Sequence, residues 1–450
     1  MKRIIYLWLM PALLVSSAGC KKYLDVVPKG RIIPNTTEDF RQLLDNNNDL
    51  NYSGHLAELA SDNLFLTDAE YLSLSTNYAR NSFIWAKEVF AADDQIKEWN
   101  NSYQRTYVAN LVLEGLNETS TGTPTERNTV KGEALFMRAH AMYNVTQVFC
   151  APWDSATAAT TLGAAIRLSS DVFVRSQRGT LQESYDQIIK DLKEAADLMP
   201  NATEFKTRPV KPAAYALLSR LYLSAGNYEL ALDYALKALA INNKLLDYKT
   251  VNPSAYPVFP KFNVEMLYYD AGSYDVPYFF VPSFNPVLYN MYSDNDYRKK
   301  LYFTATTSNG VLNVERNASY VDYGYFTGLA NDELYLTVAE CYARKNELVP
   351  ALQYLNDLLV KRIDNTFIPF DSADPETVLR KILDERRKEL AGRNLRWTDL
   401  KRLNKDPRFA VTLTRVIAGT TYTLPPNDPR YAYPIPQSVI NQTGMKQNPR

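Results

Sequence analysis

The residues best suited to do chemistry lie between positions 385 and 402, where carboxylate and guanidinium groups alternate. Glu385 and Glu389 are one helical turn apart, so their side chains share a face. An acid–base pair needs two carboxyl groups that face each other across a cleft, whereas carboxylates crowded by arginines stay ionised. We therefore expect a structural salt-bridge clasp without catalytic residues. Its expected members are Glu385 and Glu389 on one helix face, and Arg386, Arg396, Asp399 and Arg402, which are close enough in sequence to form a paired network around Trp397.

Few other side chains could catalyse a reaction or bind a metal ion. His55 and His140 are the only histidines, which argues against a histidine metal cluster or a Ser-His-Asp centre, and we expect no metal site and no cofactor. Cys150 and Cys341 could form a disulfide, but cysteines far apart in a large core are more often buried thiols. Lys plus Arg and Asp plus Glu both number 50, so no net charge attracts nucleic acid.

The N-terminus has the order of a secretory signal: a basic start, an apolar run and small residues that end on Cys20. The apolar run, 4–15, is too short to span a membrane as a mature helix. A cysteine at this place is typical of a bacterial lipoprotein that is cleaved before Cys20 and acylated on it. The alternative is an ordinary cleaved signal with an incidental cysteine. We expect a signal peptide over 1–19, a lipidated tether over 20–36 and stable membrane attachment without a spanning helix.

The elements that position these side chains are predicted to be mainly helices. Thr36 or Thr37 can cap a helix over 37–44, whose first turn is acidic. Apolar residues at helical spacing predict three longer helices, over 99–116, 129–149 and 182–199.

A repeat appears in two later segments, 211–240 and 333–360. In each, a small residue is followed by Tyr at +3, by Ala at +12 and by an apolar residue at +19. These are the packing positions of a tetratricopeptide helix pair, although the usual Trp and Pro are missing. The alternative is two unrelated amphipathic hairpins. We predict a mostly α fold with tetratricopeptide-like helix pairs near 129–241 and 332–361.

Between these segments, residues 245–330 are rich in aromatic side chains, and prolines prevent long helices there. A long irregular segment on a rigid scaffold often carries binding residues, because a Tyr or Trp ring can stack on a flat ligand. Most of these rings are nevertheless expected to cover the helical core. A second aromatic stretch spans 62–103. The residues that we expect to contact a ligand are Arg80, Trp85, Trp99, Asn101, Tyr274 and Tyr278.

Several motifs, spread over nearly the whole chain, occur together in one protein family. They are Glu385-Arg386, Arg396-Trp397-Thr398-Asp399-Leu400, Ile435-Pro436, Gln447-Asn448-Pro449 and, upstream, Gly132-Glu133-Ala134 and Asp332-Glu333-Leu334. With the lipoprotein-like start, this set closely resembles the SusD/RagB family of Bacteroidetes outer-membrane lipoproteins. The chain departs from the family at Gly392-Arg393-Asn394, where Phe-Glu-Gly or Phe-Arg-Gly is more usual, although Asn394 can still supply a left-handed turn.

The resemblance implies a single SusD-like domain over 37–450, with residues near 245–330 as its variable, ligand-facing part. It also implies a surface protein of the outer membrane that is lipid-anchored, faces outwards and binds an oligo- or polysaccharide, or sometimes a peptide. The implied partner is a SusC-like TonB-dependent transporter, over which the lipoprotein acts as a lid. Family members often place a stacking Trp and an Asn where Trp99 and Asn101 stand, but Trp99 also begins a helical pattern, so a core role stays open.

Two other classes of function are weighed against this one. A surface glycoside hydrolase needs an accessible pair of carboxylates, and none stands out. A tetratricopeptide adaptor would bind only protein partners, and the aromatic residues of 245–330 argue against it. The identity of the ligand does not follow from the fold.

Overall fold

The structure is a computed structural model, and it describes residues 34–119, 121–273, 283–308, 310–321 and 324–450. The chain divides into two units, Met1–Asn35 and Thr36–Arg450, and the second contains the helices and strands that form the candidate sites. The predicted signal peptide, Cys20 and most of the predicted tether lie outside the described residues, as do Tyr274 and Tyr278. Within the described ranges, no helix combines the length and the apolar character needed to cross a membrane.

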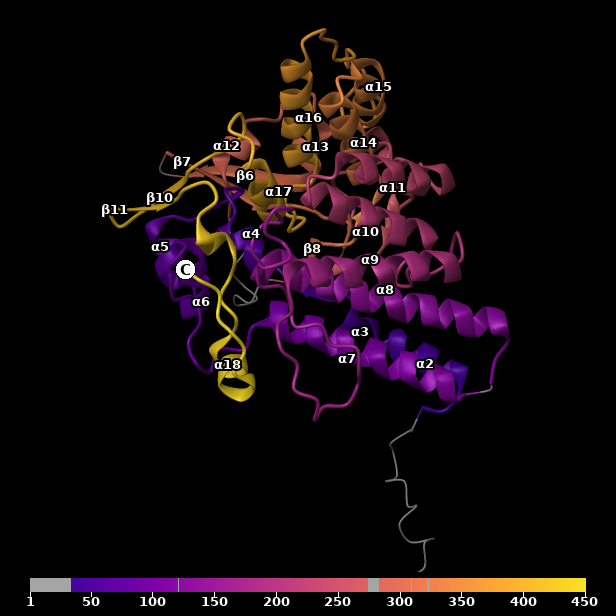
Figure 1. Cartoon of the computed structure of the whole chain (residues 1–450). Helices are drawn as coiled ribbons and strands as arrows, with labels where there is room; N and C mark the ends of the chain where they lie inside the picture. The colour runs from indigo at the N-terminus through magenta and orange to yellow at the C-terminus, as the bar shows by residue number, and fades with distance from the viewer. Residues whose placement is uncertain (1–33, 120, 274–282, 309, 322–323) are drawn as a thin grey trace, which may run out of the picture. The chain divides into compact units, whose positions relative to one another are not determined.

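Helices make up most of the regular structure of the second unit, which confirms the predicted fold class (Figure 1). In the first half of the chain they are α2 (Thr37–Leu44), α3 (Asn47–Leu50), α4 (Leu56–Ala60), α5 (Asp68–Ser73), α6 (Asn77–Phe83), α7 (Lys97–Glu118), α8 (Pro124–Phe149), α9 (Leu181–Leu198), α10 (Lys211–Ser224) and α11 (Tyr228–Ile241). In the second half they are α12 (Pro286–Tyr289), α13 (Tyr297–Tyr302), α14 (Asn331–Arg344), α15 (Leu348–Leu359), α16 (Pro375–Glu389), α17 (Arg396–Leu403) and α18 (Gln437–Thr443).

The strands are short and pair into small sheets. They are β1 (Tyr52–Gly54), β2 (Leu64–Phe65), β3 (Met266–Tyr268), β4 (Ala271–Ser273), β5 (Ser283–Phe284), β6 (Phe303–Ser308), β7 (Val311–Arg316), β8 (Tyr325–Phe326), β9 (Leu329–Ala330), β10 (Leu413–Ile417) and β11 (Thr420–Leu424). β4 lies between β1, to which it is parallel, and β8, to which it is antiparallel. The antiparallel pairs are β2–β5, β3–β9, β6–β7 and β10–β11.

The long helices predicted in the first half of the chain form, and capping residues explain where they begin. Thr36 caps α2 in a capping box with Asp39. α7 and α9 match the predicted ranges within two residues at each end. α8 begins before the predicted position 129, because Thr123 caps it and Pro124 has the backbone angle that a first helical turn requires.

α8 is the central helix of the packing. It is buried along most of its length and lies between α7 and α9, which cover opposite sides of it. Cys150, at the end of α8, and Cys341 on α14 are both buried as free thiols, so the disulfide that the sequence left open does not form.

The predicted repeat is present as two helix pairs, α10–α11 and α14–α15, that correspond at an offset of 120 residues, so that Tyr222 matches Tyr342. Tyr215 and Tyr335 take the place of the missing Trp of the tetratricopeptide pattern. In each pair, the two tyrosines of the first helix pack against a tyrosine of the second, with ring centroids 5.5 to 6.3 Å apart. The repeat therefore uses tyrosine where the usual pattern uses tryptophan.

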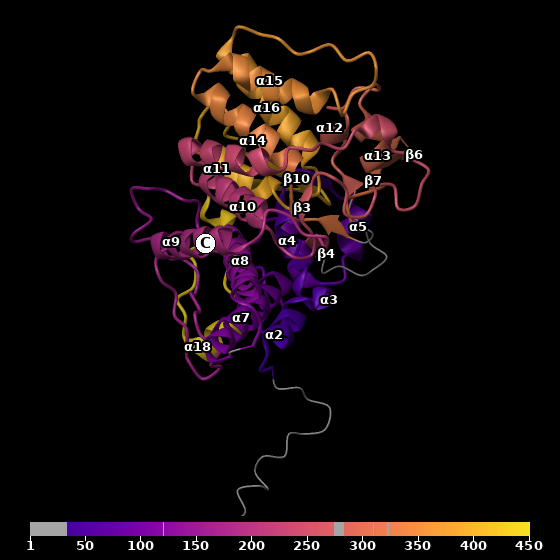
Figure 2. The same ribbon diagram turned by 90° about the vertical axis from the view of Figure 1, so that its right-hand side faces the viewer.

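The turns inside the two helix pairs also correspond. Gly226 and Asn346 occupy equivalent positions and both have left-handed backbone angles, with φ of 72° and 62°. The pairs stack through α11 and α14, and α16 packs against α14. Figures 1 and 2 show the resulting stack, which runs in chain order from α7 at one end to α15 at the other.

The described part of 245–330 contains only short helices and strands, as its prolines predict. Many of its rings point inwards. Tyr248 is buried, and its hydroxyl lies 2.7 Å from that of Tyr302 and 2.6 Å from that of Tyr320. These aromatic residues therefore form part of the core, in agreement with the expectation that most of them cover the helices.

The close approach of helices in the repeat can be tested on α11. Ala235 is fully buried there, so Ala235→Leu should lower the free energy of unfolding by about 1–3 kcal/mol through overpacking. Ala240 lies on the same helix but is exposed, and Ala240→Leu should change this free energy by less than about 0.5 kcal/mol. Urea denaturation followed by circular dichroism measures both, and equal effects would contradict the packing.

Candidate functional site

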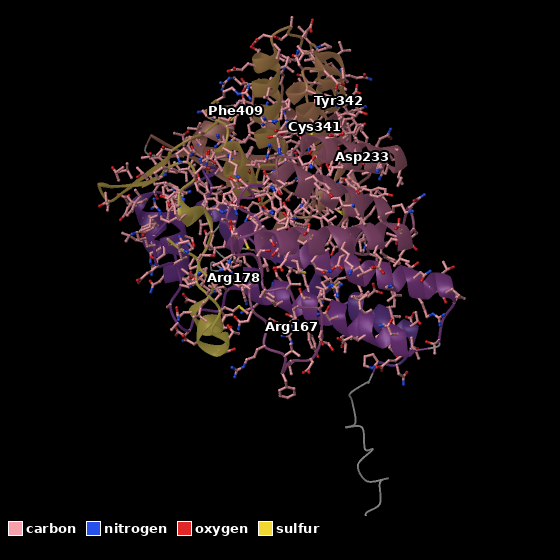
Figure 3. All side chains as sticks on the ribbon, in the orientation of Figure 1. Arg167, Arg178, Asp233, Cys341, Tyr342 and Phe409 are labelled. Atoms are coloured by element: carbon pink, nitrogen blue, oxygen red, sulfur yellow. The ribbon has the colours of Figure 1, made fainter. Side chains whose placement is uncertain are left out.

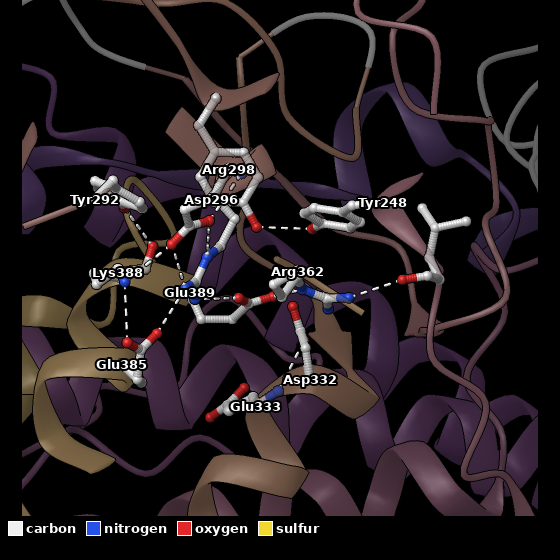
Figure 4. A network of polar contacts seen from close by, with 12 residues as sticks. Tyr248, Tyr292, Asp296, Arg298, Asp332, Glu333, Arg362, Glu385, Lys388 and Glu389 are labelled. Carbon is white, nitrogen blue, oxygen red and sulfur yellow. Dashed lines mark hydrogen bonds and ion pairs between the residues drawn. The ribbon is translucent and has the colours of Figure 1, made fainter. Parts of the chain in front are cut away.

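The predicted clasp has an arginine at its centre that the sequence did not single out. Arg298, on α13, is fully buried (Figure 4). Its guanidinium donates hydrogen bonds to three buried carboxylates, those of Asp296, Glu385 and Glu389, over distances of 2.6 to 2.9 Å. Since Glu385 and Glu389 lie on α16, these bonds tie α13 to α16.

A second buried arginine extends the same cluster. Arg362, just after α15, donates to Glu389 and to Glu265, both over 2.7 Å. Glu389 therefore pairs with both arginines, and Glu265 connects this cluster to the chain just before β3. Every charge in this cluster has a partner of opposite sign, which is the condition for burying charge without a large loss of stability.

The electrostatics of this cluster argue against a proton-transfer role for the two glutamates. Burial favours the neutral acid at Glu385, but Arg298 and Lys388 outweigh it and hold its pKa well below the usual range. Burial likewise opposes ionisation of Glu389, yet Arg362 and Arg298 lower its pKa. Both carboxyl groups are buried, so a substrate in solvent cannot reach them.

The remaining signature residues form two further clusters, because Arg396 does not join Arg386, Asp399 and Arg402 in the one paired network expected around Trp397. Arg402 donates to both carboxylate oxygens of Glu340, over 2.6 and 2.8 Å, and to Asp399. Arg386 also pairs with Asp399, at 3.0 Å. Arg396 instead pairs with Asp62, at 2.7 Å. Trp397 is buried beside these groups, and its indole N–H donates to the carbonyl of Tyr431.

Trp99, one of the six predicted ligand residues, is only 6% exposed. Its ring packs against those of Tyr103 and Phe149, at centroid distances of 4.7 and 5.2 Å. Asn101 donates its side-chain amide to the carbonyl of Tyr52, over 3.2 Å. The packing role that the sequence left open for Trp99 is therefore the one that its surroundings favour.

Arg80 and Trp85 also have internal partners. Arg80 donates to the side chain of Asn77 over 2.6 Å and to the carbonyl of Leu74. Trp85 is buried, and its indole N–H donates to the carbonyl of Ala60 over 2.8 Å. The structure does not bring Arg80, Trp85, Trp99 and Asn101 together on one exposed surface.

Trp85 lines a groove of about 430 Å³ between β2, α6 and the hairpin β10–β11. Phe65 and Val416 are exposed there, and most of the other lining side chains are apolar. The charged groups of the groove are already engaged: Asp62 pairs with Arg396, and Arg415 donates to backbone carbonyls that include that of Leu59. The groove therefore offers few free hydrogen-bonding groups to a polar ligand.

A pocket of about 520 Å³ at another place on the surface has a different chemistry. Three turns form most of it: residues 153–155 after α8, residues 224–226 from the last residue of α10 into the turn before α11, and residues 405–407 after α17. Its aromatic members are Trp153 and Tyr228, and both are partly exposed. The Trp153 ring is held by packing against Tyr185, at a centroid distance of 4.3 Å.

Charged groups of both signs surround this Trp153 pocket. Lys405 and Asp154 lie 3.6 Å apart, and the Arg344 guanidinium lies 3.7 Å from Asp406. Arg344 also stacks 4.5 Å from the centroid of the Tyr228 ring. Shorter contacts also hold these groups. Arg344 donates to Glu340 over 2.8 Å, Asp406 accepts from Arg408 over 2.7 Å, and Lys405 donates to the carbonyl of Trp153. A ligand in the pocket therefore meets charged side chains whose positions are already fixed by the protein.

Sequence reasoning missed the Trp153 pocket because its residues share no periodic pattern and come from distant parts of the chain. The available signal is Trp153 itself, a tryptophan between proline and aspartate in a stretch without helical spacing. The other tryptophans of the described residues, Trp85, Trp99 and Trp397, are all buried. Trp153 is therefore the tryptophan most accessible to solvent in this part of the chain.

Comparison with protein families adds an independent observation. A family model described as "Starch-binding associating with outer membrane" matches residues 22–223, and the model of the SusD family matches residues 332–450. Together the two matches cover most of the chain and leave out residues 1–21 and 224–331. The chain belongs to the SusD/RagB family.

Solved structures share this SusD fold over more than nine-tenths of the chain. A SusD superfamily protein from Bacteroides thetaiotaomicron is 23% identical, with a TM-score of 0.73 over 92% of this chain and 100% of that one. A putative sugar binding protein from Bacteroides vulgatus is 22% identical, with a TM-score of 0.71 over 93% and 99% of the two chains. At this identity the likeness establishes the fold alone. No curated protein matches the chain.

The departure from the usual SusD/RagB sequence at 392–394 has a structural reason. Gly392 and Asn394 both have left-handed backbone angles, with φ of 73° and 59°, as expected for Asn394. A Cβ at Gly392 would lie 2.6 Å from the ring of Tyr325. Glycine is therefore required at 392 by both the backbone and the close packing.

The Arg298 cluster predicts a large loss of stability when its centre is removed. Arg298→Met leaves three buried carboxylates without their shared cation, so the free energy of unfolding should fall by about 3–5 kcal/mol. Arg380→Met removes an exposed pair with Glu376 on α16 and should cost less than about 1 kcal/mol. Urea denaturation compares the two, and a small effect at Arg298 would show that the cluster is dispensable.

A buried acid beside the Arg396–Asp62 pair predicts a pH dependence. Burial raises the pKa of Glu58 to about 7. The folded protein then binds a proton more readily than the unfolded chain, so stability falls as pH rises from about 4.5 to 7, by up to about 3 kcal/mol. Glu58→Gln removes this titration and should make the loss of stability between pH 5 and pH 8 smaller.

Denaturation at the two pH values measures this difference. Glu229→Gln, at an exposed position on α11, is the matched control and should leave the pH dependence unchanged. An unchanged pH dependence in Glu58→Gln would show that Glu58 is ionised in the folded protein throughout this range.

Proposed function

We propose that this SusD/RagB protein is a lipoprotein, anchored through Cys20 on the outer face of the outer membrane, that binds a glycan. It passes the oligo- or polysaccharide, without cleaving it, to a SusC-like TonB-dependent transporter. Two findings support the proposal: the matching family model is described as starch-binding and associated with the outer membrane, and a structural relative is described as a putative sugar binding protein.

The observation that carries the glycan proposal is the Trp153 pocket. A sugar ring has apolar C–H faces and a rim of hydroxyl groups, so its sites combine flat aromatic side chains with hydrogen-bond donors and acceptors. The pocket provides rings at Trp153 and Tyr228, donors at Lys405 and Arg344, and a carboxylate acceptor at Asp154. Its volume of about 520 Å³ lies within the range of small-molecule sites.

The same pocket is poorly suited to hydrolyse a glycosidic bond. Such a reaction needs one carboxyl group that keeps its proton near neutral pH. The backbone N–H of Ala156 and then Lys405 lower the pKa of Asp154, and hydrogen bonds from Arg408 lower that of Asp406. Both carboxyl groups are therefore ionised and lack the proton that a general acid must donate. This favours a binding protein over a surface glycoside hydrolase.

A peptide ligand in the same lid role is the closest alternative. The apolar groove beside Trp85 is the better place for it, because extended peptides bury apolar side chains and supply their own backbone donors and acceptors. The two ligand classes thus correspond to two different places on the surface, and variants of each place can separate them.

The test uses soluble residues 21–450 in affinity electrophoresis, through gels cast with amylopectin, inulin or mucin glycans. We expect one polymer to retard the protein while its chain length stays constant. Trp153→Ala should lower the affinity for that polymer about tenfold or more, because the stacking surface is lost. Phe65→Ala, in the groove, is the matched control and should leave retardation unchanged.

The intrinsic fluorescence of the same protein locates the bound sugar. Its tryptophans are Trp85, Trp99, Trp153 and Trp397, and Trp153 alone is partly exposed, so quenching by acrylamide reports mainly on the pocket. An oligosaccharide of the retarding polymer should protect this emission. If retardation depends on Phe65 and the sugar leaves quenching unchanged, the ligand binds in the groove and not in the Trp153 pocket. Cleavage of the polymer would contradict the binding role.

A further inference from the structure

The connection between α8 and α9 carries an apolar tip that nothing in the described structure covers. Val172, Phe173 and Val174 are 68%, 91% and 50% exposed. Isolated apolar side chains are common on protein surfaces, but three consecutive ones at the end of a projecting loop form a single exposed patch. We call residues 171–175 the Phe173 tip.

The first leg of this loop is fixed to α7. The side-chain amide of Asn110 donates to the carbonyls of Arg167 and Ser169, over 3.1 and 3.2 Å. Glu114, one turn further along α7, accepts from the backbone N–H and the hydroxyl of Ser170. Six residues, 171–176, separate this anchored stretch from Gln177, whose side-chain amide donates to the carbonyl of Thr443 over 3.1 Å.

Arg167 closes the loop from inside. Its guanidinium donates to the carbonyl of Asp171, to that of Val174 over 2.9 Å and to the hydroxyl of Ser176 over 3.3 Å. Asp171 in turn accepts from the backbone N–H of Phe173, over 2.9 Å. One side chain therefore holds both sides of the Phe173 tip.

The second leg is fixed to the C-terminal tail. Arg178 donates to the carbonyl of Lys446 over 3.0 Å and to the side chain of Asn448 over 2.8 Å. Figure 3 shows Arg167 and Arg178 on the same side of the molecule, near this loop. Both legs and the base of the tip are thus ordered by polar contacts, while the apolar side chains at its end are left in water.

The position of the Phe173 tip in the second unit indicates which surface could cover it. The loop between α8 and α9 and the start of α2 lie at the same end of the second unit in both views (Figures 1 and 2). The chain between Cys20 and Thr36 can reach at most about 55 Å even when fully extended. If Cys20 carries the lipid anchor, the end that bears the Phe173 tip is the one kept near the membrane.

We propose that the Phe173 tip inserts into the lipid surface of the membrane that holds the anchor. The inference rests on the lipid anchor of the proposed function. Aromatic and aliphatic side chains with a neighbouring arginine suit the boundary between acyl chains and headgroups, and exposed Arg175 follows the apolar residues directly. A second contact fixes the orientation of the protein relative to the membrane, which attachment at a single point leaves free.

The test places a fluorescent reporter at the tip of the lipidated full-length protein. Phe173→Trp keeps an aromatic residue at an exposed position, so folding should be unaffected. The protein is bound to vesicles of phosphatidylcholine and phosphatidylglycerol in which part of the phosphatidylcholine has brominated acyl chains. We expect these lipids to quench about half of the emission that the variant adds to that of the unsubstituted protein.

Ile368→Trp is the matched control. Ile368 is 82% exposed in the connection between α15 and α16, at the opposite end of the stack in Figures 1 and 2. Its added emission should not be quenched. Vesicle flotation is measured on the same samples. Flotation without quenching of Phe173→Trp overturns the lipid contact and leaves the anchor intact, whereas lack of flotation overturns the anchor and the inference together.

Discussion

The need to neutralise buried charge is the constraint on which the rest of this SusD fold depends. Arg298 and Arg362 are fully enclosed. An enclosed guanidinium without a carboxylate would cost about 3–5 kcal/mol, which is a large part of the roughly 5–15 kcal/mol by which a typical domain is stable. The shared partner of both arginines is Glu389, at the end of α16. Helix α16, helix α13 and the chain after α15 must therefore assemble together. The irregular middle of the chain and the C-terminal helices therefore stabilise each other through these ion pairs.

Local sequence patterns predict much of the helical scaffold, whereas contacts between residues that are distant in the sequence could not be predicted. The capping residue Thr36 and the repeated tyrosines Tyr222 and Tyr342 predict helices from a few neighbouring residues, because capping and helix packing depend on short spacings. The central role of Arg298 does not follow from the sequence, because its partners Glu385 and Glu389 are about ninety positions away. The exposure of an aromatic residue is equally hidden in sequence, since the helical spacing around Trp99 fits a core position and a surface position alike.

The two candidate ligand surfaces differ in the contacts that fix their walls. The Trp153 pocket is built from turns at the ends of α8, α10 and α17, so its walls inherit the rigidity of packed helices. The groove beside Trp85 depends on the hairpin β10–β11, which Arg415 fastens to backbone carbonyls on α4 and beyond. The shape of the Trp153 pocket therefore depends on helix packing, whereas the shape of the groove depends on a few hydrogen bonds from the single side chain of Arg415.

The stacking of α11 on α14 has a consequence for how this architecture can diverge. The chain leaves the stack at the end of α11 and returns at the start of α14, so the intervening segment begins and ends at neighbouring helices. The entropy of closing such an excursion grows only with the logarithm of its length, and doubling the length costs about 0.6 kcal/mol. Insertions between the fixed points at Glu265 and Arg298 therefore cost little closure entropy, provided that they spare the paired strands β3, β4 and β5 of this stretch. Evolution can lengthen the stretch outside these strands without disturbing the helices that support it.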